Sequence, residues 1–411
     1  WDMQHATVFT GGGNCQIINS TATGQTWDGI TFTNAVFAGN GSVMRLGNNG
    51  VVNACRFVDN RATATNNNAQ GILQVYNANV TIQNSLFSGN EAGQGGAIYT
   101  SSAQNTNYTV TISGCRFENN TGIYSGISGG AIFVGGQYAT TNVIGNTFVG
   151  NTVTGSTAHG AAVAVNGGTA TTTLIGNNIF VGQTAKPAVY MQGARLYNNT
   201  FYGNDGCINA SGAYATIVAN NAFFGTLGTL AYSSNITFNN NATFSAVSGS
   251  NLTLADNIVI SNNNLTRTAV DTRYNLDMTT IDGEHNYAAF FDPDNADFRL
   301  LGVSDLIDAG TTLADVTTDI RGASRTSGTY DIGAYEMTCH TLTVSLSTDG
   351  SGVGATVYVD RGTVTIPVGS GAANEQMTIR AADGEQKIVG LERITRTDVA
   401  NDGSITSLLY N

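Results

Sequence analysis

One pattern of apolar and polar positions recurs seven times in the first half of the chain. It consists of an apolar residue, any residue, Gly or Asn, any two residues, Phe, any two residues and Asn. The Phe positions are Phe57, Phe87, Phe117, Phe148, Phe180, Phe201 and Phe223, spaced by 30, 30, 31, 32, 21 and 22 residues. Three copies deviate, with Ala54 at the Gly/Asn position and Gln183 and Thr226 at the Asn position. A unit that repeats every 20–50 residues is typical of a solenoid.

The pattern predicts two short strands joined by a bend. Val110 and Ile112 before Gly114, and Cys115 and Phe117 after it, alternate with a period of two. Gly and Asn enter the left-handed backbone region at least cost, so the chain bends there. We therefore expect an all-β protein whose residues 1–280 form a right-handed parallel β-helix of about ten coils.

Stacking of the coils predicts what the repeated residues do. Coils stack about 4.8 Å apart, so equivalent Phe residues form an aromatic stack in the core. The Asn three residues later is expected to form a ladder of side-chain amides. Binding of sugar or nucleic acid by the Phe residues is the alternative to core packing.

Composition and charge narrow the classes of partner. The 411 residues include 51 Gly, 3 Pro and only 11% charged residues, which suits tight turns and polar stacks. The net charge of −12, with Lys186 and Lys387 as the only lysines, argues against nucleic acid and anionic lipid. No apolar run approaches the roughly 18 residues of a membrane span. We expect a monomer that is compatible with a bound cation.

The five cysteines are expected to be buried thiols. Cys55 and Cys115 hold the same inward position, but Ser85 lies in the coil between them. Two coil spacings, roughly 9–10 Å, exceed the separation that a disulfide allows. Metal ligation would need a Cys/His cluster, and the spacings show none.

A second element recurs out of phase with the first. Gly95-Gly96-Ala97-Ile98 and Gly129-Gly130-Ala131-Ile132 are close copies, and Gly160-Ala161-Ala162-Val163 is a looser one. With Phe-x-x-Asn, these motifs resemble those of the chlamydial polymorphic outer-membrane proteins over roughly residues 50–165. That resemblance implies a β-helix displayed on a cell surface and used in adhesion.

A different resemblance covers residues 281–336. Its motifs, in order, are Asp292-Pro293, Asp297-Phe298-Arg299-Leu300, Ile307-Asp308-Ala309-Gly310, Asp319-Ile320-Arg321-Gly322, Arg325 and Asp331-Ile332-Gly333-Ala334-Tyr335-Glu336. They resemble the choice-of-anchor Q region of bacterial surface proteins, which implies export and no particular reaction. We expect residues 281–338 to close the helix, with an ion-pair network that caps the last coil. A catalytic or cation site is the alternative for these charges.

Residues 339–411 differ in pattern from the helix. Short alternating segments such as 340–346, 355–359 and 363–366 are separated by Gly-rich turns, and the Phe pattern is absent. These features predict a small antiparallel β-sandwich as an accessory domain.

The sequence identifies no catalytic residues. Hydrolases on β-helices need converging carboxylates, and no Asp-Asp pair occurs in this chain. A lyase needs a base, and the helix has one lysine, Lys186. His159 precedes Gly160, as in the Gly-His-Gly of pectin hydrolases, but Ala158 replaces the first Gly, so a loop residue is the simpler interpretation. A polysaccharide lyase or glycoside hydrolase nevertheless stays open as the alternative function.

Three acidic residues form a candidate cation site. Asp59, Glu91 and Glu118 follow their Phe residues in adjacent coils by two, four and one positions. If they share a corner, they could hold Ca²⁺ together with backbone carbonyls. Their unequal offsets favour solvated carboxylates instead.

The longer coils predict a binding edge. Their extra residues follow the repeated Asn (61–70, 121–128 and 152–159) or the Gly-Gly strand (101–108 and 135–141). Insertions at one point of consecutive coils project from one edge, which solenoids use for recognition. Tyr99, Tyr108, Tyr124 and Tyr138 lie near this edge, and tyrosine suits sugar binding; exposed loop tyrosines without a ligand are the alternative. We expect an exported, adhesin-like protein without catalysis that binds polysaccharide or host-surface glycan.

Overall fold

The computed structural model describes most of residues 7–259 and shorter parts of the remainder. The described residues are 7–11, 16–64, 70–102, 108–135, 139–167, 172–212, 214–225, 227, 230–232, 236–243, 252–259, 290–300, 304, 306–325, 329–337, 339–346, 356–359, 362–365 and 375–382. The chain forms two compact units, of which the first comprises residues 1–261 and 308–336 and the second residues 262–307 and 337–411.

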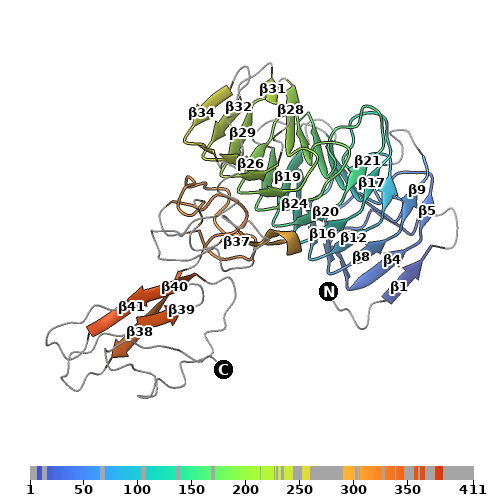
Figure 1. Cartoon of the computed structure of the whole chain (residues 1–411). Coiled ribbons are helices and arrows are strands. Elements are labelled where there is room, and N and C mark those ends of the chain that lie inside the picture. The colour runs from blue at the N-terminus through green and yellow to red at the C-terminus, as the bar shows by residue number, and fades with distance from the viewer. Residues whose placement is uncertain are drawn as a thin grey trace. The chain divides into compact units, whose positions relative to one another are not determined.

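Three long parallel sheets form most of the described part of the first unit (Figure 1). The eleven-stranded sheet contains, in order, β1 (Thr7–Thr10), β4 (Ile30–Thr33), β8 (Arg56–Val58), β12 (Leu86–Ser88), β16 (Arg116–Glu118), β20 (Thr147–Val149), β24 (Ile179–Val181), β27 (Thr200–Tyr202), β30 (Ala222–Phe224), β33 (Ala242–Thr243) and β35 (Ile258–Val259). The nine-stranded sheet contains β2 (Ile18–Ser20), β6 (Met44–Leu46), β10 (Leu73–Tyr76), β14 (Ile98–Ser101), β18 (Ile132–Gly135), β22 (Val163–Asn166), β25 (Val189–Met191), β28 (Ile208–Gly212) and β31 (Leu230–Tyr232). The ten-stranded sheet contains β3 (Gln25–Asp28), β7 (Gly50–Asn53), β11 (Val80–Gln83), β15 (Tyr108–Ser113), β19 (Ala139–Ile144), β23 (Thr173–Gly176), β26 (Arg195–Tyr197), β29 (Thr216–Ala219), β32 (Ile236–Asn239) and β34 (Leu252–Ala255).

The chain passes through these sheets in turn, one strand of each per coil, and this order builds a right-handed parallel β-helix as the repeats predicted. A five-stranded sheet of short strands joins some of the coils. It consists of β5 (Val36–Phe37), β9 (Arg61–Ala62), β13 (Glu91–Ala92), β17 (Thr121–Gly122) and β21 (Thr152–Val153).

The predicted bend has the left-handed backbone that it requires. Asn84, Gly114 and Asn177 have φ of 51°, 60° and 53°, and even Ala54 has φ of 50°. A second bend of the same kind lies just before the repeated Asn, for example at Asn119 with φ of 52°. Each coil therefore has two sharp corners beside the eleven-stranded sheet.

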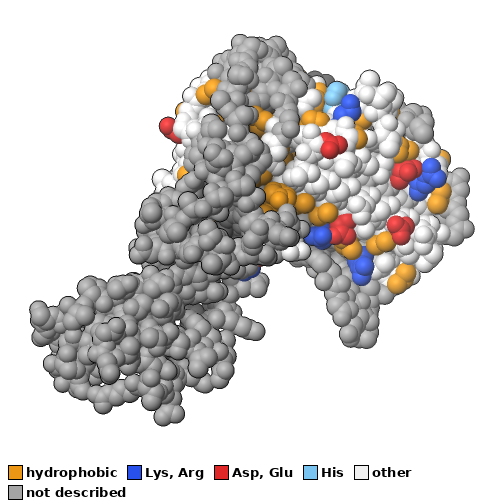
Figure 2. All heavy atoms as spheres, viewed as in Figure 1, with side chains coloured by type: hydrophobic (Ala, Val, Ile, Leu, Met, Phe, Trp, Pro, Cys, Tyr) orange, Lys and Arg blue, Asp and Glu red, His pale blue; other side chains and the backbone are white. Residues whose placement is uncertain are grey.

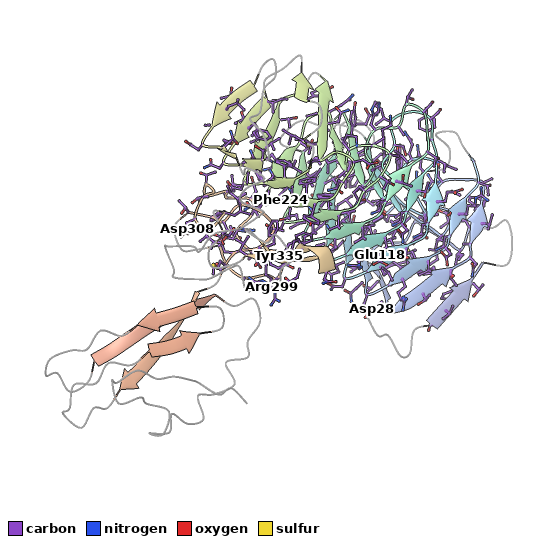
Figure 3. All side chains as sticks on the ribbon, in the orientation of Figure 1. Asp28, Glu118, Phe224, Arg299, Asp308 and Tyr335 are labelled. Carbon is purple, nitrogen blue, oxygen red and sulfur yellow. The ribbon has the colours of Figure 1, made fainter. Side chains whose placement is uncertain are left out.

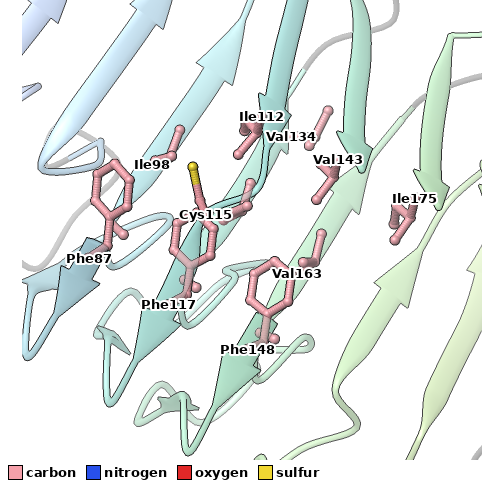
Figure 4. Packing of buried hydrophobic residues seen from close by; sticks show 14 of the residues in the cluster. Phe87, Ile98, Ile112, Cys115, Phe117, Val134, Val143, Phe148, Val163 and Ile175 are labelled. Carbon is pink, nitrogen blue, oxygen red and sulfur yellow. The ribbon is translucent and has the colours of Figure 1, made fainter. Parts of the chain in front are cut away.

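The repeated Phe residues form the predicted core stack. From Phe57 to Phe223, successive ring centroids lie 4.7–5.0 Å apart, and each of these rings is fully buried (Figure 4). Phe32 extends the stack toward the N-terminus. Core packing, and not ligand binding, is therefore the role of these rings.

The repeated Asn residues form the predicted amide ladder. The Asn120 side-chain oxygen accepts hydrogen bonds from the backbone and side-chain N–H groups of Asn90 at 3.1 and 2.9 Å. The Asn120 side-chain nitrogen donates to the Phe87 carbonyl and to Asn151, both at 2.9 Å. Each buried amide thus joins successive coils.

A second ladder runs parallel to the first and was not predicted. It consists of Asn146, Asn178, Asn199, Asn221, Asn241 and Asn257, each bonded to the next through its side-chain amide. In the earlier coils Cys55, Ser85 and Cys115 occupy this position, and the Cys115 N–H donates to the Asn146 side-chain oxygen at 2.9 Å. Cys55, Cys115 and Cys207 are buried free thiols, as expected. The side chains of Cys15 and Cys339 lie outside the described part of the chain.

Residues 308–336, hereafter the side segment, contact the side of the helix. Asn198 donates to the Asp331 carbonyl at 2.9 Å, and Asn220 bonds both backbone groups of Thr311. Val316 packs with Leu174, Tyr197 and Ala219 outside the ten-stranded sheet. The prediction placed this region across the last coil. Its described contacts run instead along the corner asparagines of consecutive coils, where bent backbone leaves amide side chains pointing outward.

Buried charges hold the side segment together. The guanidinium of Arg325 donates five hydrogen bonds. Two go to side chains, to Glu336 Oε2 at 2.7 Å and to Asn177 Oδ1 at 3.0 Å, and three go to the backbone carbonyls of Thr318, Asp331 and Gly333. The Asp319 carboxylate accepts hydrogen bonds from the backbone N–H groups of Arg321, Ala323 and Glu336 and from the side chain of Arg321. The Arg321 guanidinium lies over the ring of Tyr335, which is labelled in Figure 3. The predicted ion-pair network therefore exists, and it joins the side segment to the helix.

The second unit contains a short pair of strands and two further antiparallel pairs. β36 (Phe290–Asp292) pairs with β37 (Asp297–Leu300) across η1 (Pro293–Asn295). β38 (Cys339–Leu346) pairs with β41 (Glu375–Ala382), and β39 (Thr356–Val359) with β40 (Gly362–Thr365). The antiparallel pairing agrees with the strands expected there; packing into a β-sandwich stays a prediction.

Candidate functional site

Two of the predicted insertions form a matched pair of loops, hereafter the double loop. They comprise residues 123–128 and 154–159, between β17 and β18 and between β21 and β22. The Thr157 N–H donates to the Ser125 carbonyl at 3.0 Å, and Tyr124 N–H donates to Gly93 O at 2.9 Å. The backbone bridge between Gly129 and Gly160 closes both loops at the same level. Backbone hydrogen bonds therefore hold the two loops in register.

A layer of aromatic side chains lies beneath the double loop, on the outer face of the nine-stranded sheet. Tyr99, Phe133, Ala164 and Tyr190 occupy equivalent positions of β14, β18, β22 and β25. Each is at most 8% exposed, and the Tyr99 and Phe133 rings stack with centroids 5.3 Å apart. Ile127 of the first loop packs on this cluster. The layer thus supports the loops.

The predicted tyrosines do not all lie at the surface. Tyr99 is buried in the aromatic layer, and burial raises its pKa. Because Tyr99 is only 8% exposed and one face of its ring packs on Phe133, it offers no surface on which a sugar could stack, and it belongs to the layer that supports the loops. Tyr124 is partly exposed in the double loop, and Tyr108 is partly exposed at the start of β15, beyond the other end of β14. Tyr138 lies outside the described residues.

His159 ends the second loop and lies over the aromatic layer. Its ring stacks on Tyr190 with centroids 4.4 Å apart, and Gln192 Nε2 donates to Tyr190 Oη at 2.7 Å. Burial, and then the charge of Lys186, lowers the pKa of His159 below its ordinary value. The ring is therefore neutral at pH 7, and it anchors the loop as Ile127 does.

The three acidic residues proposed for Ca²⁺ each have another environment. Glu91 pairs with Arg61 at 2.7 Å, and Glu118 pairs with Arg116. Asp59 lies at the second corner with φ of 54°. Within the described residues, no three His, Cys, Asp or Glu side chains are grouped so that they could hold a metal ion. The structure thus does not bring the three carboxylates together as a site.

Sequence reasoning missed Phe133 and Tyr190. Each follows the apolar residue of a Gly-Gly-Ala-Ile-like segment, as Tyr99 does, and the segment before Tyr190 reads Pro187-Ala188-Val189. If the alignment of these segments is extended by the one residue that follows the apolar position, that residue is aromatic in three of the four coils. Alternation in a strand then places that position on the outer face.

The described surface is poor in charge around this site. On the face drawn in Figure 2, charged side chains lie singly or in small groups on a surface of uncharged side chains and backbone, and a histidine lies beside a cationic side chain. In the double loop the exposed residues are Ser125, Thr154, Ser156 and Thr157. The groups of the double loop that a ligand could contact are therefore mainly hydroxyl groups and the rings of Tyr124 and His159.

Comparison with known proteins assigns no family. The sequence matches none of the family models searched and none of the curated proteins. The likenesses to chlamydial and anchor-region motifs therefore remain resemblances. Among the described residues, no helix is both long enough and apolar enough to cross a membrane.

Proposed function

We propose that this protein is a non-catalytic, adhesin-like β-helix that binds polysaccharide or host-surface glycan at the double loop. The observation that carries the proposal is the double loop itself, an ordered edge with Tyr124 and four exposed hydroxyl side chains. Hydroxyls and an aromatic ring are the groups that bind sugars by hydrogen bonding and stacking.

Preorganisation supports a binding role for this edge. Ile127 and His159 fix the loops on the aromatic layer, and Thr157 bonds across to Ser125. A ligand that binds ordered loops does not have to meet the entropy cost of ordering them. The short coils form the same helix without these loops, so the fold itself does not require them.

Export and surface display belong to the same proposal. Their support is the motif resemblance of residues 50–165 and 281–336 to bacterial surface proteins. A low content of charge and many Gly, Asn and Thr residues accord with a long polar rod of that kind.

The test replaces Tyr124 by Ala and measures retention on a panel of immobilised neutral and acidic polysaccharides. Retention should fall by at least about tenfold, because affinity concentrates in a few aromatic contacts. Tyr76→Ala is the matched control, since Tyr76 is 38% exposed in β10, outside the double loop. Thermal melts should be nearly unchanged for both variants. Undiminished retention by Tyr124→Ala would contradict the proposal.

A polysaccharide-degrading enzyme is the second candidate. The observation that favours it is the placement of His159 and Lys186 on adjacent coils, next to each other in register, because a lyase needs a base and a cation near its substrate. The same panel decides between the two functions. New reducing ends, or absorbance from unsaturated uronates, would replace the binding function by a catalytic one.

A further inference from the structure

Lys186 lies beside the double loop, one coil beyond His159. The Ala161 N–H donates to the Pro187 carbonyl at 2.8 Å, and Val163 pairs with Val189, so Lys186 lies opposite Gly160, the residue that follows His159, in the adjacent coil. Lys186 is the only lysine before residue 387. A single ammonium group therefore stands at the end of the surface that the double loop forms.

This ammonium has no anionic partner within the described residues. No ion pair within 4 Å joins Lys186 to a described carboxylate. Asp205, in the next coil, accepts the Ala185 N–H at 2.7 Å through Oδ2, so its carboxylate is bonded to backbone. Lys186 is only partly exposed, which reduces the solvent that competes with a bound anion.

An unsatisfied polar atom lies on the same sheet face. Asn209 pairs with Tyr190 in register, on the strand next to it. The side-chain oxygen of Asn209 is buried and has no hydrogen-bond partner among the described residues. A buried acceptor without a partner is unfavourable, so a turn of the partly exposed Asn209 side chain toward a ligand hydroxyl would gain a bond that the protein lacks.

Together these groups suit a sugar that carries a negative charge. Lys186 and Tyr190 are four residues apart, at most about 14 Å of extended chain. This upper limit allows a single oligosaccharide to contact both residues. A neutral His159 supplies one N–H donor between the two ends.

We propose that Lys186 and His159 bind the carboxylate or sulfate of an acidic sugar unit, and that Asn209 accepts a hydroxyl group of a neighbouring unit. This inference rests on the proposed glycan binding and adds the class of glycan. The net charge of −12 repels polyanions at long range, so the attraction is local and falls with added salt.

The experiment compares retention of four polymers by the full chain: hyaluronate, its carboxyl-reduced form, dextran sulfate and dextran. The wild type should retain one acidic polymer at least about tenfold better than its neutral counterpart, the factor that 1.4 kcal/mol gives. Lys186→Gln should lose this preference and keep the neutral binding. A preference within the hyaluronate pair identifies a carboxylate, and one within the dextran pair identifies a sulfate.

Arg61→Gln is the matched control. Arg61 is also a cation near the loop edge, but it is 60% exposed and already paired with Glu91. Its replacement should leave the preference intact. The melt of Lys186→Gln should equal that of the wild type, because no described ion pair is lost.

The outcomes separate this inference from the proposed function. The anionic subsite is wrong if Lys186→Gln keeps the full preference for the acidic polymer. It is also wrong if the wild type shows no such preference while Tyr124→Ala still loses retention. In both cases the proposed glycan binding stands. If the wild type retains none of the four polymers or the other polysaccharides of the panel, the proposed function fails and this inference fails with it.

Discussion

Arg325 donates a hydrogen bond of 3.0 Å from Nη2 to the side-chain oxygen of Asn177, 148 residues earlier in the chain. Asn177 lies at a corner of the helix with φ of 53°, so one residue both bends the coil and receives the side segment. The same guanidinium bonds Glu336 at 2.7 Å and is fully buried. The side segment is therefore attached through a charge that has five partners in this one arrangement.

Replacing Arg325 by Met should lower the free energy of unfolding by about 3–5 kcal/mol, because Glu336 would be left buried without its partner. Urea denaturation measures the loss, and hydrogen exchange should show it first in residues 308–336. Arg299→Met is the control, since Arg299 and Asp297 are each 26% exposed and such pairs contribute less than about 1 kcal/mol. Equal losses in the two variants would show that the buried pair is not special.

Glu336 predicts a pH dependence of the same attachment. Burial, its largest cause, raises the pKa of Glu336 above the ordinary 4.5. A carboxyl group with a raised folded-state pKa adds stability below pH 4.5, and this contribution is lost as the pH rises through the folded value. Glu336→Gln cannot titrate, so the stability of the wild type relative to this variant should fall as the pH rises through that window. A difference that grows with pH would reverse the sign and refute the assignment.

The parts of the fold that depend on repetition were predictable from the sequence. Phe117 and Asn120 recur at a fixed offset, and stacking at one coil spacing turns each recurrence into a ladder. The side segment has no such repeat. Its partners, Asn177, Asn198 and Asn220, were already explained as bend residues, so their second role left no separate signal in the sequence.

The candidate site was predictable only in part. Insertion lengths located the edge, and Tyr124 lies there. Alternation shows on which side of a strand Tyr99 projects, but not that packing and neighbouring loops bury it. The Lys186–His159 pair depends on the register between two coils of different length, which the sequence does not define at that point.

The Asn ladder should tolerate no loss of its amide. In Asn120→Ala, the Asn90 N–H and the Phe87 carbonyl lose their partners, and each unmet buried group costs about 1–3 kcal/mol. A chemical melt should therefore show a loss of at least about 2 kcal/mol. The neighbouring Asn119→Gly change should cost far less, because Asn119 has φ of 52° and Gly150 holds the equivalent corner of the next coil. If the two variants lose similar free energies of unfolding, the amide ladder does not contribute the stability assigned to it.

The Phe stack can be tested in one coil. Phe117→Ala removes a fully buried ring between Phe87 and Phe148 and should cost about 3–5 kcal/mol. Arg116→Ala changes the adjacent outward residue, whose pair with Glu118 is partly exposed, and should cost under about 0.5 kcal/mol. Urea melts compare the two variants. Comparable values would mean that the inward and outward faces of β16 are wrongly assigned.

Thiol reactivity reports on the core of the helix without altering it. Burial raises the pKa of Cys115 and of Cys207 to about 12. Since the thiolate is the reactive form, at pH 8 only about one in ten thousand such groups is ionised, and none is accessible to reagent. In a variant with Ser at positions 15 and 339, three of the five cysteines remain: Cys55, Cys115 and Cys207. The native protein should show almost no reaction with an aromatic disulfide reagent over hours, and three thiols should react promptly in denaturing urea. Rapid modification of any of them under native conditions would mean that the coils around it open far more readily than a continuous stack of buried rings allows.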